Sequence, residues 1–384
     1  MVPYTAKIPG SDVSFEMIPV EGGVVRVGEV GGEIEDAELP TSSEVLVRVE
    51  PRWVGKYEVT WDEYWQYMAL DTTFAQLKQL REAVAMSKGT EKPIEPRLKK
   101  FPKLWNALSA TPSHVDGVTS PTPLYDPSTT YESGEEPRLP AVTMSPYAAR
   151  QYTKWLSVIT GNDYRLPSEA EWEHAARAGG EGPYGTAADG STIATDKLGD
   201  FAWTANNSDY ASQEVGQKPA NAWGLYDVLG NVAEWVLDEP RDEPNKPTAS
   251  DKAIDWAKAV AWPTQAYPRI AKGGFWDAAP ADCRIASRLV SDDEEWKASD
   301  PNYPLSPWWF TESPADGVGF RLVRPLKPMD EETRRLAWET GNEEIRDAVD
   351  TRLEEGRGKL QTIDEDLPAA IEELNSPNVQ KILN

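Results

Sequence analysis

Tryptophan content restricts how this chain can fold more than any other feature of its sequence. The 384 residues include 16 tryptophans, and few of them lie in a continuous apolar run. Large aromatic rings can fill a core while hydrogen-bonding at one edge, so they suit a fold with modest regular secondary structure. We therefore predict that most of the tryptophans form the core of such a fold.

The charge balance limits the partners that the chain can have. Asp and Glu total 64 against 39 Lys and Arg, which gives a formal net charge of −25. A chain of this charge repels polyphosphate, so nucleic acid is not an expected partner. A solvated acidic surface is the simplest interpretation of the charge, and carboxylate-rich calcium sites are the alternative.

The sequence contains no segment of about 18 apolar residues, so we expect no membrane span. The first residues, Met1 to Tyr4, lack the basic and apolar regions of a signal peptide. A leader removed from the chain would leave the same start, so export and compartment stay open. The one cysteine, Cys283, excludes an intramolecular disulfide.

Three helices are predicted from residues that suit helix ends. Thr60 precedes an aromatic run at helical spacing, and Ser145 precedes a proline that fits a first helical turn. The helix after Ser145 is expected to end at Gly161. Ser168 and Glu171 form a capping-box pattern for the third helix.

Alternating apolar positions predict strands over residues 13–20, 24–28 and 54–60. An insertion follows at about residues 71–140. Its first part, 74–86, reads as a helix, and repeated prolines predict that the rest is irregular.

A change in composition marks the end of the chain. Past Pro328 the sequence becomes charged, and Ile345, Val349 and Leu353 recur every four residues. This spacing predicts a helical tail that packs along the domain or along a partner.

Four motifs follow one another after the second predicted helix. They are Arg165–Trp172 (RLPSEAEW), Gly224–Trp235 (GLYDVLGNVAEW), Gly273–Trp276 (GGFW) and Gly319–Arg321 (GFR). Their order resembles the formylglycine-generating enzyme, or sulfatase-modifying factor, family. The resemblance implies an α+β fold, a variant of the C-type lectin architecture with little regular secondary structure. A C-terminal helical tail is added to it here.

The resemblance also sets the expected domain boundaries. Residues 1–12 are interpreted as an N-terminal arm. The family-like domain is expected over 13–327, with the insertion at about 71–140 inside it. Residues 328–384 are expected to form the helical C-terminal extension.

The residues that carry the family's chemistry differ in this chain. In the family, two cysteines after the Gly-Gly pair hold copper(I), and a cysteine of a substrate peptide is oxidised to formylglycine. Counted from Gly274, Cys283 falls on the second cysteine position, Ala278 replaces the first, and Phe275 replaces a serine. One thiolate is a poor site for copper(I), which prefers two soft ligands, so copper is not expected. Cys283 is interpreted as a small buried apolar residue on a strand beside Ile285.

Histidine does not supply another catalytic group. Only His114 and His174 are present, and neither belongs to a metal-binding motif. No Gly-x-Ser-x-Gly pattern occurs, so hydrolase chemistry has no support. We expect His174 to be a packed or hydrogen-bonded ring on the third predicted helix.

The resemblance implies calcium as the metal that the chain would keep. Its ligands would come from one tight turn, and they correspond to Asp227, Gly230, Val232 and Glu234. Carboxylate and carbonyl oxygens are the hard ligands that calcium prefers. A second family site maps to Asn207 and Ser208. The alternative for Glu234 is a buried carboxylate satisfied by backbone donors.

Aromatic residues near the last motifs are candidates for a ligand-binding face. Trp276 follows the Gly-Gly pair, and Tyr303, Trp308 and Trp309 lie on a loop interrupted by prolines. Loop aromatics between prolines can line a cleft and give a large contact area. The alternative is that they fill an irregular core.

These observations favour a non-oxidase member of the family. It would be a calcium-stabilised scaffold, not an enzyme, that binds a protein, peptide or glycan ligand. One alternative is a formylglycine-generating oxidase that acts on a sulfatase cysteine through Cys283 and ligands that the sequence does not identify. The other is a copper-independent enzyme that uses the same cleft.

Overall fold

The computed structural model describes residues 1–28, 45–124, 127–241, 252–300, 305–339 and 342–383. Tyr303, one of the predicted ligand-binding residues, lies outside these ranges. No helix within them is both long and apolar enough to cross a membrane.

The first sheet joins the start of the chain to the end of the family-like domain. Its order is β1 (Tyr4–Lys7), β2 (Ser14–Val20), β5 (Arg52–Gly55) and β12 (Val323–Pro325), and each pair is antiparallel. The segment interpreted as an N-terminal arm thus supplies the edge strand β1. The strand predicted over 54–60 is shorter, because it ends at Gly55.

The second sheet lies in the part of the chain that carries the last three motifs. Its order is β10 (Arg288–Val290), β9 (Ile270–Lys272), β7 (Ala233–Trp235) and β11 (Val318–Gly319), with β11 parallel to β7. The third sheet contains β3 (Gly23–Val27), β4 (Val45–Val49) and β8 (Ile254–Asp255).

The three predicted capped helices are present. Helix α1 (Trp61–Met68) has the capping box between Thr60 and Glu63. Helix α5 (Pro146–Thr160) begins with the Ser145 hydroxyl accepting a hydrogen bond from a backbone N–H and ends at Gly161, whose φ is 65°. Helix α6 (Glu169–Arg177) has a capping box between its N-cap serine and Glu171. Local polar contacts therefore fix where these helices begin.

The insertion and the tail contain more regular structure than the sequence predicts. The insertion supplies α2 (Leu70–Ser87), α3 (Glu95–Leu98), α4 (Pro102–Ser109) and β6 (Gly117–Ser120). The tail supplies α9 (Glu331–Trp338), α10 (Glu343–Glu354), β13 (Lys359–Thr362), α11 (Leu367–Leu374) and α12 (Pro377–Leu383). Short elements elsewhere are η1 (Thr195–Asp200), α7 (Trp256–Ala259), η3 (Pro280–Cys283), α8 (Asp293–Trp296) and η4 (Ala315–Gly317).

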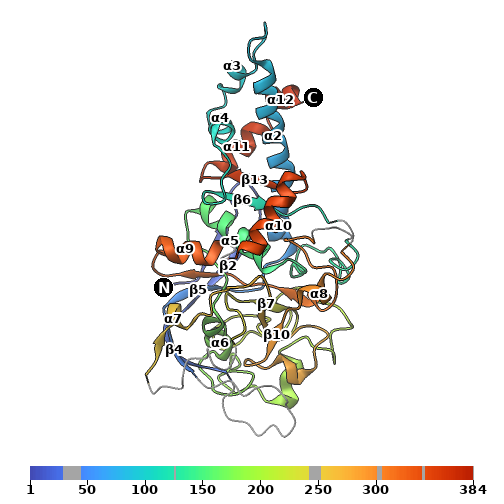
Figure 1. Ribbon diagram of the computed structural model, residues 1–384. Coiled ribbons are helices and arrows are strands. Elements are labelled where there is room, and N and C mark those ends of the chain that lie inside the picture. The colour runs from blue at the N-terminus through green and yellow to red at the C-terminus, as the bar shows by residue number, and fades with distance from the viewer. Residues whose placement is uncertain (29–44, 125–126, 242–251, 301–304, 340–341, 384) are drawn as a thin grey trace.

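The insertion and the end of the tail form one projection, which we call the insertion–tail lobe (residues 70–120 and 359–383). Strand β13 pairs antiparallel with β6, α11 packs on α4, and α12 contacts α2. Figure 1 shows these helices extending together from the rest of the molecule. The Lys103 ammonium lies 2.6 Å from the Asp366 carboxylate, and Glu373 accepts a 2.8 Å hydrogen bond from the Leu104 N–H.

Aromatic rings form much of the main core, as the sequence predicts. The rings of Tyr64 and Tyr152 stack with centroids 5.7 Å apart, and α1 thereby packs on α5. The Trp235 indole N–H donates to the Met144 carbonyl at 3.0 Å. This combination of ring burial and one edge hydrogen bond joins sheet, helix and loop segments without long regular elements.

The packing of α11 in the insertion–tail lobe predicts how substitutions on this helix change the free energy of unfolding. Leu374 of α11 is 1 % exposed within the main core cluster, so Leu374→Ala should lower the free energy of unfolding by about 2–5 kcal/mol. Glu372→Ala, on the exposed side of the same helix, should change it by less than about 0.5 kcal/mol. Urea unfolding measures both values. Equal stability of the two variants would show that the tail does not pack on the insertion.

Candidate functional site

The segment after the Gly-Gly pair is closely packed. A methyl group added at Gly274 would lie 2.5 Å from the Cys283 Sγ atom, and Gly274 has a φ of 71°. One added at Gly317 would lie 2.2 Å from the Phe275 ring. Phe275, at the position of the family's serine, therefore occupies the space between this segment and the turn before the last motif.

Cys283 is fully buried, and it shares an apolar cluster with Ala278 and Ile285. Burial raises the pKa of its thiol to about 12, so the thiolate needed for metal binding or redox chemistry is disfavoured. The residue lies in η3, so the strand predicted for it is wrong, although its burial agrees with the prediction. The site offers one thiol where copper(I) would need two soft ligands, so these residues do not fit copper.

Glu234, the main predicted calcium ligand, is 1 % exposed and forms a buried ion pair. The Arg321 guanidinium donates to it at 2.7 Å from Nη2 and at 3.0 Å from Nε. The Trp172 indole N–H donates to the other carboxylate oxygen at 2.8 Å. The donors are thus side chains, not the backbone groups of the alternative interpretation.

Asp227 lies beside this pair in a conformation that side chains seldom adopt, with φ at 52°. One of its carboxylate oxygens accepts a 2.6 Å hydrogen bond from the Gly216 N–H, and the other is buried without a partner. Burial raises the pKa of Asp227 to about 6. Glu58 is buried nearby, and both burial and the charge of Asp227 raise its pKa well above the usual value.

Both oxygens of Glu234 already have a cationic partner, Arg321. In the parts of the chain that the structure describes, no three His, Cys, Asp or Glu side chains are grouped to hold a metal. Of the two carboxylates among the predicted ligands, Asp227 offers an unused oxygen. Calcium at Asp227, Gly230, Val232 and Glu234 stays a prediction of the sequence.

The second predicted calcium position is also engaged in internal hydrogen bonds. The Asn207 side-chain oxygen accepts from the Thr204 N–H at 2.9 Å, and its amide donates to the Gly199 carbonyl at 2.9 Å. The Ser208 hydroxyl donates to the Trp276 carbonyl at 2.9 Å. These contacts hold the loop between η1 and the Gly-Gly segment.

The predicted ligand-binding tryptophans are buried. Trp276, Trp308 and Trp309 are 6 %, 0 % and 3 % exposed. The Trp308 indole donates to the Thr119 hydroxyl in the insertion at 3.2 Å, which makes Trp308 a core residue. Trp309 borders a cavity.

That cavity, which we call the Trp309 cavity, has a volume of about 740 Å³. Trp309 and Phe310 contribute aromatic walls from the domain, and the tail contributes Arg357 and Lys359. Asp71, in the first turn of α2, completes one side. The cavity therefore lies where the family-like domain, the insertion and the tail meet, which the motifs alone do not indicate.

A separate cavity of about 310 Å³ is lined by Glu58, Glu63, Tyr57 and Arg138; we call it the Glu63 cavity. Glu63 is 6 % exposed, and burial raises the pKa of its carboxyl to about 7. Sequence reasoning identified Glu63 neither as a capping residue nor as part of a site. The Thr60-x-x-Glu63 spacing was the available signal for the cap.

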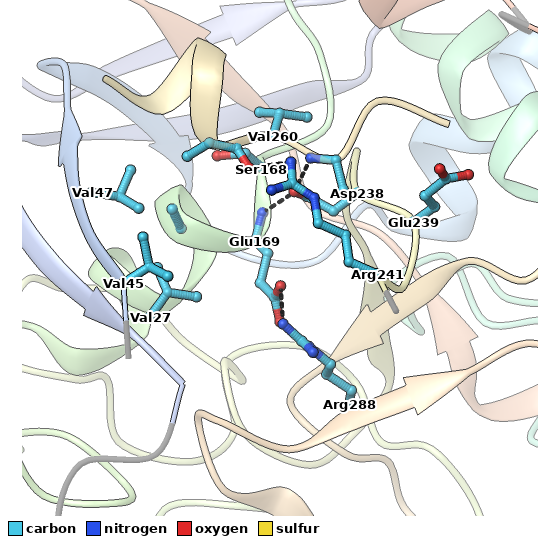
Figure 2. Close-up of a pocket in the computed structure, with 13 residues that line it drawn as sticks. Val27, Val45, Val47, Ser168, Glu169, Asp238, Glu239, Arg241, Val260 and Arg288 are labelled. Atoms are coloured by element: carbon cyan, nitrogen blue, oxygen red, sulfur yellow. Dashed lines mark hydrogen bonds and ion pairs between the residues drawn. The ribbon is translucent and has the colours of Figure 1, made fainter. Parts of the chain in front are cut away.

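Figure 2 shows a smaller cavity, of about 70 Å³, between the valines of β3 and β4 and the start of α6. Its charged groups are engaged in hydrogen bonds and ion pairs within the protein. The Arg288 guanidinium donates to the Glu169 carboxylate at 2.7 Å, and Asp238 accepts from the Glu169 N–H at 2.7 Å. These contacts hold the N-terminus of α6 against the second sheet.

His174 is the packed ring that the sequence predicts. Its centroid lies 4.9 Å from that of Trp223. Burial, together with the nearby Arg52 charge, lowers the pKa of His174 to about 3. The ring is therefore neutral at physiological pH.

The raised pKa of Glu63 predicts how stability depends on pH. The folded value of about 7 exceeds the unfolded 4.5, so this group reduces stability as pH rises from 4.5 to 7. Glu63→Gln should raise the free energy of unfolding above neutral pH by an amount on the order of 3 kcal/mol. Below pH 4.5 it should change little. Chemical unfolding across this range measures the difference, and parallel curves for the two proteins would contradict it.

The Glu234–Arg321 pair predicts a loss that does not depend on calcium. Glu234→Gln should lower the free energy of unfolding by about 3–5 kcal/mol, because Arg321 would stay buried without its counter-charge. The loss should be the same in excess calcium and after chelation. A calcium-dependent melting temperature in the unmodified protein that disappears in Glu234→Gln would instead make Glu234 a calcium ligand.

Comparisons with known proteins agree on the family. Residues 8–300 match the profile of the sulfatase-modifying factor enzyme 1-like domain. The chain is 26% identical to the chaperone protein LppX of Paenibacillus barcinonensis over 281 residues, which cover 69% of this chain and 79% of LppX. It is 32% identical to the formylglycine-generating enzyme of Mycobacterium tuberculosis over 152 residues, which cover 38% and 48% of the two chains.

Other relatives extend well beyond the shared region. A serine/threonine-protein kinase, pkn1 of Chlamydia pneumoniae, is 26% identical over 71% of this chain, but the match spans only 35% of the kinase.

Among solved structures, Treponema denticola variable protein 1 aligns with a TM-score of 0.50 and 20% identity, over 85% of this chain and 99% of that one. This last likeness concerns the fold alone. Because the profile covers residues 8–300 and the predicted α+β fold is present, the chain belongs to the sulfatase-modifying factor family.

Proposed function

We propose that this chain is a non-oxidase member of the family that binds a protein, peptide or glycan ligand. The observation that carries the proposal is the state of the segment after the Gly-Gly pair. Ala278 stands where a second thiol would be needed, and Cys283 is buried in an apolar cluster with its pKa raised. The Phe275 ring fills the adjoining space.

The Trp309 cavity supports binding as the remaining activity. Its volume of about 740 Å³ falls within the range of about 300–1,000 Å³ typical of ligand sites. Aromatic walls offer contact area, while Lys359 and the hydroxyls of Thr122 and Thr129 offer polar contacts. Since the tail helps to form the cavity, its ligand need not be the ligand of any relative.

The name of one relative agrees with binding without defining it, and other names favour the oxidase alternative. LppX is named as a chaperone, and a chaperone binds another chain. The relatives named formylglycine-generating enzyme favour the oxidase alternative. The buried single thiol opposes that alternative, because copper(I) needs two soft ligands.

Copper binding separates these two functions. Anaerobic titration of the protein with copper(I) against a competing chelator should reveal no stoichiometric tight site. A cysteine-containing sulfatase-type peptide incubated with protein, copper and oxygen should yield no formylglycine by mass spectrometry. Tight one-to-one binding that is lost in Cys283→Ala would overturn the non-oxidase proposal.

Ligand binding at the Trp309 cavity can be tested by filling it. Thr129→Trp should lower the affinity for probes retained from a glycan array and a peptide library at least tenfold, because the indole would occupy the cavity. Thr192→Trp, at an exposed threonine elsewhere, should bind like the unmodified protein. Thermal melting confirms that both variants fold. Retention of full binding by Thr129→Trp, or no binding to any probe, would contradict the assignment.

A further inference from the structure

The Glu63 cavity is a second candidate site, independent of the one proposed above. It lies between the first sheet and the N-terminus of α1, and it shares no lining residue with the Trp309 cavity. All of its lining residues belong to the ranges that the structure describes. Its volume of about 310 Å³ suits a group the size of a short side chain.

Glu63 turns one unused carboxylate oxygen toward this cavity. Its Oε1 accepts hydrogen bonds from the Thr60 N–H at 3.2 Å and from the Thr60 hydroxyl at 3.0 Å. Oε2 accepts none from the described part of the chain, although Glu63 is more than nine-tenths buried. Since Oε2 is not sealed from solvent, a donor that enters the cavity can reach it.

Glu58 adds a second buried carboxylate to the lining. It is 1 % exposed, and its oxygens accept from the Asn231 side-chain amide at 2.9 Å and from the Val232 N–H at 3.2 Å. Both donors are neutral. Neither Glu58 nor Glu63 forms an ion pair with any described Lys, Arg or His, so the two carboxylates share a cavity without a counter-ion in contact.

The cavity lining includes a cation, Arg138, whose guanidinium bonds to groups other than the two carboxylates. Arg138 donates from Nη2 to the Val215 carbonyl at 3.0 Å, and its guanidinium lies 5.6 Å from the centroid of the Tyr57 ring. It is exposed to solvent at the rim. Arg138 therefore reduces the negative potential of the cavity without pairing with either carboxylate.

We propose that the Glu63 cavity binds a primary alkylammonium group. Glu63 Oε2 accepts one N–H of the ammonium, and the Glu58 carboxyl lies on the same lining. The apolar lining receives the alkyl stem; it consists of Val13, Phe15, Val59, Val215 and Leu322. The proposal does not depend on the function of the Trp309 cavity.

The geometry favours ammonium over guanidinium. A guanidinium group binds best when one carboxylate presents both oxygens to its two parallel N–H groups. Glu63 Oε1 is taken by Thr60, so only Oε2 is free. An ammonium is a compact charge with three rotatable donors, and it accepts oxygens supplied singly from different side chains.

Calorimetric titration with n-butylamine tests the proposal, with n-butanol as the neutral probe of the same shape. The amine should bind at one site, and the alcohol should bind at least tenfold more weakly. Glu63→Gln keeps an acceptor for the Thr60 cap but removes the charge, so it should weaken amine binding at least tenfold. Glu132→Gln, an exposed glutamate outside the cavity, should leave it unchanged.

Arg138→Gln should change the amine affinity in the opposite direction from Glu63→Gln. Removing the rim cation should tighten amine binding severalfold, which a general loss of structure would not do. Nα-acetyl-lysine methylamide tests whether the ammonium comes from a lysine side chain of a partner, and n-butylamine tests a free amine.

Three outcomes would overturn the proposal. The first is binding of neither ammonium probe by the folded protein. The second is equal amine affinity of Glu63→Gln and the unmodified protein, with melting curves showing that both are folded. The third is a tenfold preference for N-butylguanidine over n-butylamine, which would assign the cavity to guanidinium.

Discussion

The ion pair between Arg321 and Glu234 connects the parts of this fold that carry the motifs. Glu234 lies on β7 of the second sheet, and Trp172 on α6 donates to its carboxylate. Arg321 also donates to the carbonyls of Gly55 at 2.9 Å and Tyr226 at 2.8 Å. One buried guanidinium thus binds the first sheet, the second sheet and the turn before Asp227. Three of the four sequence motifs meet at this pair, and the fourth lies close to it because the Gly273 carbonyl accepts from the Gly230 N–H at 2.9 Å.

Features set by neighbours in the sequence were predictable, and those set by distant residues were not. The caps at Thr60, Ser145 and Ser168 depend on contacts three residues away, so their patterns sufficed. The partner of Glu234 is far along the chain, and the residue type alone did not distinguish a calcium ion, backbone donors or an arginine. The pairing of β6 with β13 joins residues 117–120 to 359–362. No local pattern indicates that the insertion and the tail form one lobe.

The candidate sites also combine features that the local sequence predicts with features that depend on distant residues. Once the motifs were recognised, the sequence predicted that Cys283 is buried. It also showed that Ala278 replaces the other cysteine of the family pair. The Trp308 indole donates to Thr119 in the insertion, and Trp309 borders a cavity. The pattern of the proline-interrupted loop did not distinguish a core tryptophan from one beside a cavity. The Trp309 and Glu63 cavities each combine segments that are distant in sequence. Trp309 was predicted to line a cleft, but the walls from the insertion and the tail, and the whole Glu63 cavity, were not predicted. In physical terms, the sequence specified the chemistry of single residues, while tertiary packing specified which of them face a cavity.

The chain keeps the fold of its family, and Ala278 stands at the position of one of the two cysteines that hold copper(I) in the family. The most direct test restores that pair with the double variant Ala278→Cys, Phe275→Ser and measures anaerobic copper(I) affinity, using Phe275→Ser alone as the control. The folded double variant should bind one copper(I) tightly, while the control and the unmodified protein should not. Copper(I) binding by the unmodified protein as tight as that of the double variant, or no binding by a double variant that its melting curve shows to be folded, would contradict the non-oxidase proposal.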